Sequence, residues 1–114
     1  MAQDGVFAEL LNGDSRAWEA FVRRYAGLVV AAVRGIAPGP SDIEDFTQEV
    51  FVRLCKDDFR LLRSYDSERA AISTWITIVA RSTARDAMRR RIASRAVLRA
   101  TIVIQVETAA RSGS

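Results

Sequence analysis

The chain has 114 residues, a length that allows one compact domain and excludes an enzyme with two separate cores. Of these residues, 49% are apolar and 27% are charged. It has no histidine and one cysteine, Cys55, so the sequence excludes a His or Cys metal cluster, an intramolecular disulfide and a histidine general base. The lone cysteine, and the lack of a secretory signal in residues 1–10 and of a long apolar run, predict a cytoplasmic protein without membrane contact.

The net charge of +3 is distributed unevenly along the chain. Residues 1–59 carry 6 basic and 10 acidic side chains, whereas residues 60–114 carry 11 basic and 4 acidic ones. All basic residues except Lys56 are arginines, whose planar donor group suits phosphates and base edges. A basic half is usually only a solvated surface, but so strong an asymmetry favours a nucleic-acid partner.

The first part of the chain predicts three helices joined by short loops. A short helix over 6–11 ends at Asn12-Gly13. A second helix begins after an N-cap at Asp14 or Ser15, and it has a wide apolar face over about 20 residues. Gly35 and residues 38–40 end it. Residues 41–44 form a capping box, which predicts that the third helix begins at Asp42 with Ser41 as its N-cap and ends at 56–58.

After an apolar and basic link over 59–65 and a polar loop over 66–71, a fourth helix begins between Ser67 and Ser73. It runs at least to Arg91, and the pattern also allows it to continue to Arg99. Residues 101–106 are β-branched and allow a strand, a frayed helix end or the start of a linker, and residues 111–114 look unstructured. The predicted fold is all-α, a small bundle of three to four helices built around Trp18, Phe21, Phe46, Phe51 and Trp75.

Two of these helices carry distinctive charged faces. On a helical wheel the third helix is assigned an outward, mainly acidic face, which suits docking on a basic partner helix, although a merely solvated face is the alternative. That face contains Asp42, Asp45, Glu49, Val52 and Lys56, with Gln48 at its flank. On the fourth helix, Arg81, Arg85 and Arg89 form a basic edge of the kind that follows a phosphate backbone, again with a solvated face as the alternative. Asp86 lies nearer the apolar stripe, which predicts pairing with arginine rather than DNA contact, and Trp75 is expected in the core.

Three segments resemble region two of the bacterial RNA polymerase sigma factors, most closely the extracytoplasmic-function (ECF) group. They are residues 13–25, residues 42–51, and residues 73–81 leading into 86–91, and the resemblance covers about residues 6–95. That family normally continues into a second helical domain, region four. We therefore expect a region-two domain over 1–100, followed over 101–114 by the start of a linker. The chain is then either a fragment or a natural single-domain relative.

The resemblance implies a transcription initiation domain that docks on RNA polymerase core and recognises and melts the minus-ten promoter element, without catalysis, cofactor, metal or small-molecule substrate. The implied polymerase partner is the clamp helices of the largest subunit, and the implied DNA partner is the non-template strand. The polymerase-binding residues are expected to be Asp42, Asp45, Gln48, Glu49, Val52 and Arg53. The DNA-binding residues are expected to be Arg60, Arg63, Ser64, Tyr65, Ser73, Thr74, Arg81, Ser82, Arg85 and Arg89.

In ECF relatives the loop before the recognition helix captures a base flipped out of the stack, and the corresponding segment here is 64–74. Tyr65 is the aromatic side chain there that either stacks on a base or fills the bundle. The sequence departs from many relatives at Ser82, where an asparagine is common, and at Ser73, where an aromatic residue is common. The first departure leaves the base preference open.

Two other functions are compatible with parts of the sequence. A protein-interaction module that binds polymerase or an anti-sigma factor without sequence-specific DNA contact is the main alternative, and the net charge of the second half argues against it. An enzyme with Cys55 as nucleophile is disfavoured because the chain has no histidine to activate the thiol.

Overall fold

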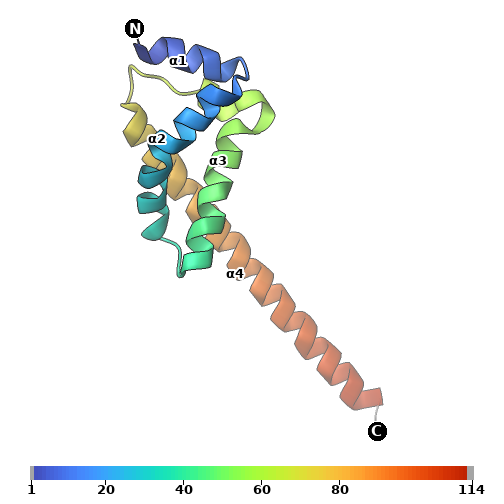
Figure 1. The fold of residues 1–114 in the computed structure, drawn as a ribbon. Coiled ribbons are helices and arrows are strands. Elements are labelled where there is room, and N and C mark those ends of the chain that lie inside the picture. Colours follow the sequence, from blue (N-terminus) through green and yellow to red (C-terminus); the bar gives the residue numbers. More distant parts are fainter. Residues whose placement is uncertain (1, 113–114) are drawn as a thin grey trace.

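The computed structural model describes the backbone of residues 2–112 and the side chains of residues 7–111. It contains four helices and, over the described residues, no strand: α1 (Ala2–Leu11), α2 (Ser15–Arg34), α3 (Pro40–Arg63) and α4 (Ile72–Ser112). Helices α2, α3 and the first part of α4 pack against one another, and α1 lies across one end of α2 and α3 (Figure 1). The predicted all-α bundle is confirmed, although α1 begins at Ala2 rather than residue 6.

The starts of α2 and α3 differ in how they are capped. Asp14 is the N-cap of α2, and its Oδ1 accepts hydrogen bonds from the backbone N–H groups of Arg16 (2.9 Å) and Ala17 (3.2 Å). Helix α3 begins at Pro40, two residues before the predicted start, and its N-cap Gly39 offers no side-chain hydrogen bond. The predicted capping box is therefore wrong, because proline favours the first helical position and draws Ser41 into the first turn.

Helix α3 is interrupted where the sequence predicts its end. Lys56 has an extended ψ of 149°, and Asp57, Asp58 and Phe59 have φ values of 54°, 57° and 58°, in the left-handed region. A further helical turn then runs to Arg63 and places Leu62 fully in the core. Arg63 fastens this turn, because its guanidinium donates to the carbonyl oxygens of Asp58 (2.7 Å) and Leu11 (2.6 Å).

The centre of the bundle is mainly aliphatic. The largest fully buried side chains are Leu10, Val29, Val33, Val50, Leu54, Leu62, Ile76 and Thr83. Among the five aromatic residues predicted for the core, Phe21 and Phe46 are buried, and the other three are half-buried and pack against it. Trp18 stacks on Phe21, with ring centroids 5.6 Å apart, so the aromatic side chains form one end of the core rather than its middle.

Helix α4 leaves the bundle and continues as a single rod (Figure 1). Every side chain from Ile92 to Arg111 is exposed, and the described molecule measures 75 × 26 × 23 Å. Residues 101–106 are helical, so neither a strand nor a helix end lies there, and the expectation of an unstructured end is wrong for Arg111 and Ser112. Residues 113–114 lie outside the described part of the chain. The helix continues because residues 92–112 contain no Gly or Pro and extending a helix is easier than starting one.

Across the described residues, none of the helices combines the length and apolar character that crossing a membrane requires.

Candidate nucleic-acid interface

The seam between α3 and α4 is held by ion pairs between acidic residues and arginines of the two helices. Asp42 is buried, with 7% of its surface exposed, and pairs with Arg91. The prediction that Asp42 faces outward is therefore wrong. Asp42 precedes the buried Phe46 by four residues, and residues four apart share a helix face, so this spacing already indicated the buried side.

Further along the seam, Glu49 pairs with Arg90. Arg53 of α3 contacts Asp86 of α4 at 3.3 Å, and Asp86 also pairs with Arg89 at 2.8 Å. The predicted pairing of Asp86 with arginine is confirmed. Of the six residues predicted to bind polymerase, Asp42, Glu49 and Arg53 thus contact α4.

The other three predicted polymerase-binding residues form an exposed stripe on α3. Asp45, Gln48 and Val52 are spaced at i, i+3 and i+7, so they share one face. The side chain of Asp45 has no ion pair within the described residues, and Val52 is 58% exposed although it is apolar. We call these three residues the α3 stripe, a surface with one free negative charge and one exposed apolar contact.

On α4 the predicted basic edge is exposed. Arg81 and Arg85 have no ion-pair partner within the described part of the chain, whereas Arg89 is paired with Asp86. Ser82 is exposed beside Arg81, and Ser73 and Thr74 are exposed in the first turn of the helix. Ser82 therefore lies where a side chain can reach a nucleic acid that follows the edge.

Tyr65 belongs to the bundle rather than to the surface of the loop. Its ring lies between those of Phe7 (5.9 Å) and Trp75 (5.2 Å), and its hydroxyl donates a hydrogen bond to the carbonyl oxygen of Ala70 (2.8 Å). Of the two alternatives for this residue, the structure supports packing. Trp75 is half-buried against the core, as the sequence predicted.

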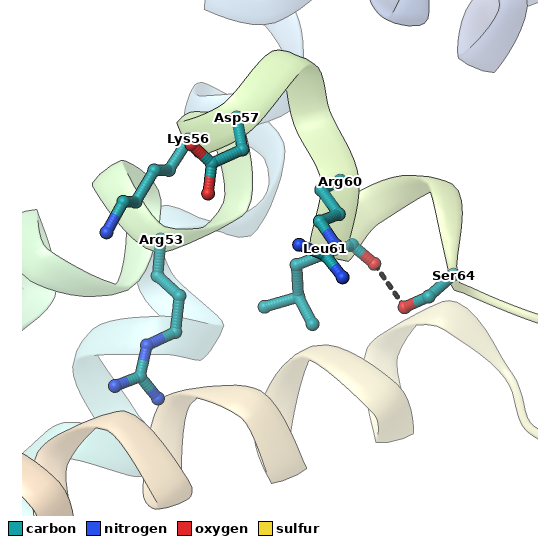
Figure 2. Close-up of a pocket in the computed structure, with 6 residues that line it drawn as sticks. All are labelled: Arg53, Lys56, Asp57, Arg60, Leu61 and Ser64. Carbon is teal, nitrogen blue, oxygen red and sulfur yellow. Dashed lines mark hydrogen bonds between the residues drawn. The ribbon is translucent and has the colours of Figure 1, made fainter.

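An open pocket of about 300 Å³ lies directly before the loop, at the lower end of the usual volume range for ligand pockets (Figure 2). It is lined by Arg53, Lys56, Asp57, Arg60, Leu61 and Ser64. Because Arg53 is paired with Asp86, Lys56 and Arg60 against the carboxylate of Asp57 give the pocket a small excess of positive charge. Of the predicted DNA-binding residues, Arg60 and Ser64 line it, whereas Arg63 is directed toward Asp58 and Leu11.

Sequence reasoning did not place Lys56 and Asp57 at this pocket. The left-handed turn that brings them there contains no glycine, the residue that usually indicates such a turn in a sequence.

Comparison with known families gives one match. Residues 21–93, about two thirds of the chain, match the family described as Sigma-70 region 2. The match includes all of α3 and the part of α4 that packs in the bundle. No curated protein and no solved structure matches the chain significantly.

Proposed function

The chain belongs to the sigma-70 region 2 family, a non-enzymatic domain of transcription initiation factors that takes part in RNA polymerase binding and minus-ten promoter recognition, and on this premise we propose a division of labour between α3 and α4. The α3 stripe docks on the clamp helices of the polymerase core. The arginine edge of α4 and the segment 64–74 hold the non-template strand. We further propose that the chain is of the ECF type.

The observation that carries this proposal is which charges remain unpaired. Three acids of the α3–α4 seam are neutralised by arginines, whereas Asp45 on α3 and Arg81 and Arg85 on α4 have no ion-pair partner within the described residues. Unpaired exposed charges act on other molecules, because opposite potentials steer encounter and exclude wrong partners. Asp45 suits a basic protein surface and the two arginines suit phosphates.

The pocket before the loop supplies a place for an unpaired nucleotide. Flipping a base out of the stack costs a few kcal/mol, which a receiving site must offset. Arg60 and Lys56 offer charge to the phosphate, and Ser64, whose hydroxyl already donates to the carbonyl oxygen of Leu61, offers an acceptor oxygen. Since the ring of Tyr65 is packed in the bundle, hydrogen bonds and charge rather than stacking on this tyrosine would hold the nucleotide.

The alternative is a module that binds polymerase or an anti-sigma factor without reading DNA. It explains the α3 stripe but gives no role to the unpaired Arg81 and Arg85 or to the electropositive pocket.

Docking is tested by Asp45→Lys, which reverses the one free charge of the α3 stripe. Co-purification with core polymerase should be lost while the melting temperature changes little, because an exposed charge contributes little to folding. Glu19→Lys, an equal reversal at an exposed site on α2, is the matched control and should bind core normally. Normal binding of core polymerase by the Asp45 variant would show that the α3 stripe is not the docking surface.

DNA reading is tested by Arg85→Ala and Ser82→Asn in complexes with core polymerase, on promoters permuted one base at a time. Arg85→Ala, which removes a phosphate contact, should weaken open-complex formation on every promoter sequence equally, since phosphate contacts carry no sequence information. The Ser82 variant should change the preferred base, by about 1–3 kcal/mol for a well-formed contact. If both variants behave as wild type, the interaction module without DNA contact becomes the better description.

A further inference from the structure

We propose that the projecting half of α4, residues 92–112, pairs in antiparallel orientation with the same segment of a second copy of this chain. The contact surface consists of Leu98, Ile102 and Val106, which we call the apolar ridge. This proposal concerns self-association and does not depend on the polymerase and DNA contacts of the proposed function. The ridge lies beyond residue 93, where the family match ends.

The projecting half of α4 carries apolar surface that the bundle does not cover. Six of the ten residues over 97–106 are β-branched, and no residue over 100–106 is charged. Because β-branched residues are weak helix formers, a helix of this composition depends on packing for most of its stability. A large exposed apolar patch marks an interaction surface. The large aliphatic side chains that remain 50–66% exposed are Ile92, Val97, Leu98, Ile102, Val103, Ile104 and Val106.

The apolar ridge follows one side of the helix. Its three residues are spaced four apart, so at 100° per residue they fall within a sector of about 80°. Rows of residues four apart are the ridges that interdigitate when two helices pack. Val97 and Ile104 lie on the other side of the helix, about 150° from Ile102. The longest row of large aliphatic side chains is therefore the one through Ile102.

The ridge is complementary to itself. When two antiparallel copies cross at Ile102, positions equally far from Ile102 on either side come level. Leu98 then meets Val106 of the second copy, and Ile102 meets Ile102, as an interface with two-fold symmetry requires. Arg95 lies in the same sector and comes level with Ala109, whose small side chain leaves room for the arginine stem. A second copy of the chain thus fits this surface.

The charges of the segment favour the antiparallel orientation. In a parallel pair Arg95 and Arg99 would each lie beside the same arginine of the second copy, and such like-charge contacts are unfavourable. In the antiparallel pair Glu107 comes level with the stretch between Arg95 and Arg99 of the second copy. Opposite charges then face each other across the pair.

The shape of the molecule leaves room for this pairing. The projecting half is about 31 Å long and runs clear of the other helices, so each bundle would lie beyond the tip of the second copy's helix (Figure 1). Burying an aliphatic side chain removes on the order of 100 Å² of apolar surface from water. The ridge, Val103 and the stem of Arg95 in both copies together give about 1,000 Å², the lower limit for a specific interface. The expected dimer is therefore reversible.

Self-association is tested by sedimentation equilibrium of the 114-residue chain from about 1 to about 200 µM, the range that suits a small interface. The average mass should rise from 12.6 kDa toward twice that value as the concentration increases. Ile102→Gln with Val106→Gln should raise the dissociation constant by about tenfold or more, because it removes two thirds of the ridge. The matched control is Val97→Gln with Ile104→Gln, on the other side of the helix, and it should associate as wild type does.

Glutamine has a higher helix propensity than isoleucine or valine, so neither pair of substitutions should melt α4, and circular dichroism checks this. A wild-type chain that stays monomeric over the whole range, or an equal loss of association in both variants, would overturn the proposal. The ridge would then be left to a different protein.

The orientation is tested by cross-linking with a short bismaleimide in a Cys55→Ser background. Leu98→Cys chains mixed with Val106→Cys chains should cross-link to each other. Neither variant alone should do so, because the antiparallel pair separates identical positions by about 12 Å along the axis. Cross-linking of each variant with itself but not with the other would show a parallel pair and contradict the antiparallel arrangement.

Discussion

Asp42 and Asp45 are three residues apart on one helix and have different surroundings. Asp42 is buried and pairs with Arg91, whose side chain is 35% exposed, whereas Asp45 is exposed and has no ion pair within the described residues. Removing one partner of a buried pair leaves the other charge uncompensated, which costs more than losing an exposed charge. Asp42 therefore stabilises the fold, and Asp45 is available to a partner.

Asp42→Asn should lower the free energy of unfolding by about 1–3 kcal/mol, because it removes the charge from a buried partner of Arg91. Asp45→Asn should change it by less than about 0.5 kcal/mol, as at an ordinary surface site. Urea denaturation of the two variants at equal ionic strength measures the difference. Equal stabilities would mean that Asp42 is as well solvated as Asp45.

At the scale of the element, the interruption of α3 turns the chain back toward the core. Three consecutive non-glycine residues with φ between 54° and 58° each occupy a conformation that costs an L-residue roughly 1–2 kcal/mol. The burial of Leu62 and the hydrogen bonds of Arg63 to Asp58 and Leu11 offset that cost. The turn therefore depends on the contacts made by the helical segment after it.

Asp57→Gly should leave stability unchanged or raise it by up to about 1 kcal/mol, because glycine adopts a positive φ without steric cost. The same substitution in the regular part of α3, Asp45→Gly, should lower stability by about 1 kcal/mol, as glycine does in an exposed helix interior. Thermal unfolding of both variants shows whether each substitution raises or lowers the stability. A loss at both positions would show that Asp57 is helical in solution.

Local features of these elements were predictable from the sequence, and pairings across the chain were not. The Asp14 cap was predictable because its hydrogen bonds reach only two and three residues, and the break in α3 because Lys56, Asp57 and Asp58 disrupt the apolar pattern. The start of α3 was missed because two local signals competed and Pro40 prevailed.

For the candidate site, the sequence predicted the exposed Arg81 and Arg85 from helical spacing alone. It missed the pair of Glu49 with Arg90, because these residues are 41 positions apart and only the packing of α4 on α3 brings them together. The orientation of Arg63 away from the pocket depends in the same way on Leu11.

At the scale of the whole molecule, stability and length belong to different parts of the chain. The Cα radius of gyration is 19.7 Å, against about 13 Å for a compact domain of this size, because α4 projects from the bundle. The buried residues of α4 lie between Ile76 and Ala87, and every side chain from Ile92 to Arg111 is exposed. The projecting half therefore adds little to the core.

Ending the chain after Ser94 should change the melting temperature by less than about 4 °C, which corresponds to less than about 1 kcal/mol for a domain of this size. The far-ultraviolet circular dichroism should fall, because a long helical segment is lost. Ending it after Ala84 is the contrasting variant, since it also removes Ala87 and the arginines that pair with Asp42 and Glu49, and it should unfold the bundle. A large loss of stability in the longer variant would contradict an independent bundle.

The uninterrupted α4 also makes the molecule a lever. Its 21 residues from 92 to 112 form an arm of about 31 Å at 1.5 Å per residue. A tilt of about 10° at the seam, where Asp42 and Glu49 hold the helix, displaces the tip by about 5 Å. Small adjustments where the two helices meet are thus magnified at the far end of the arm, and a ligand held there would exert torque on the bundle.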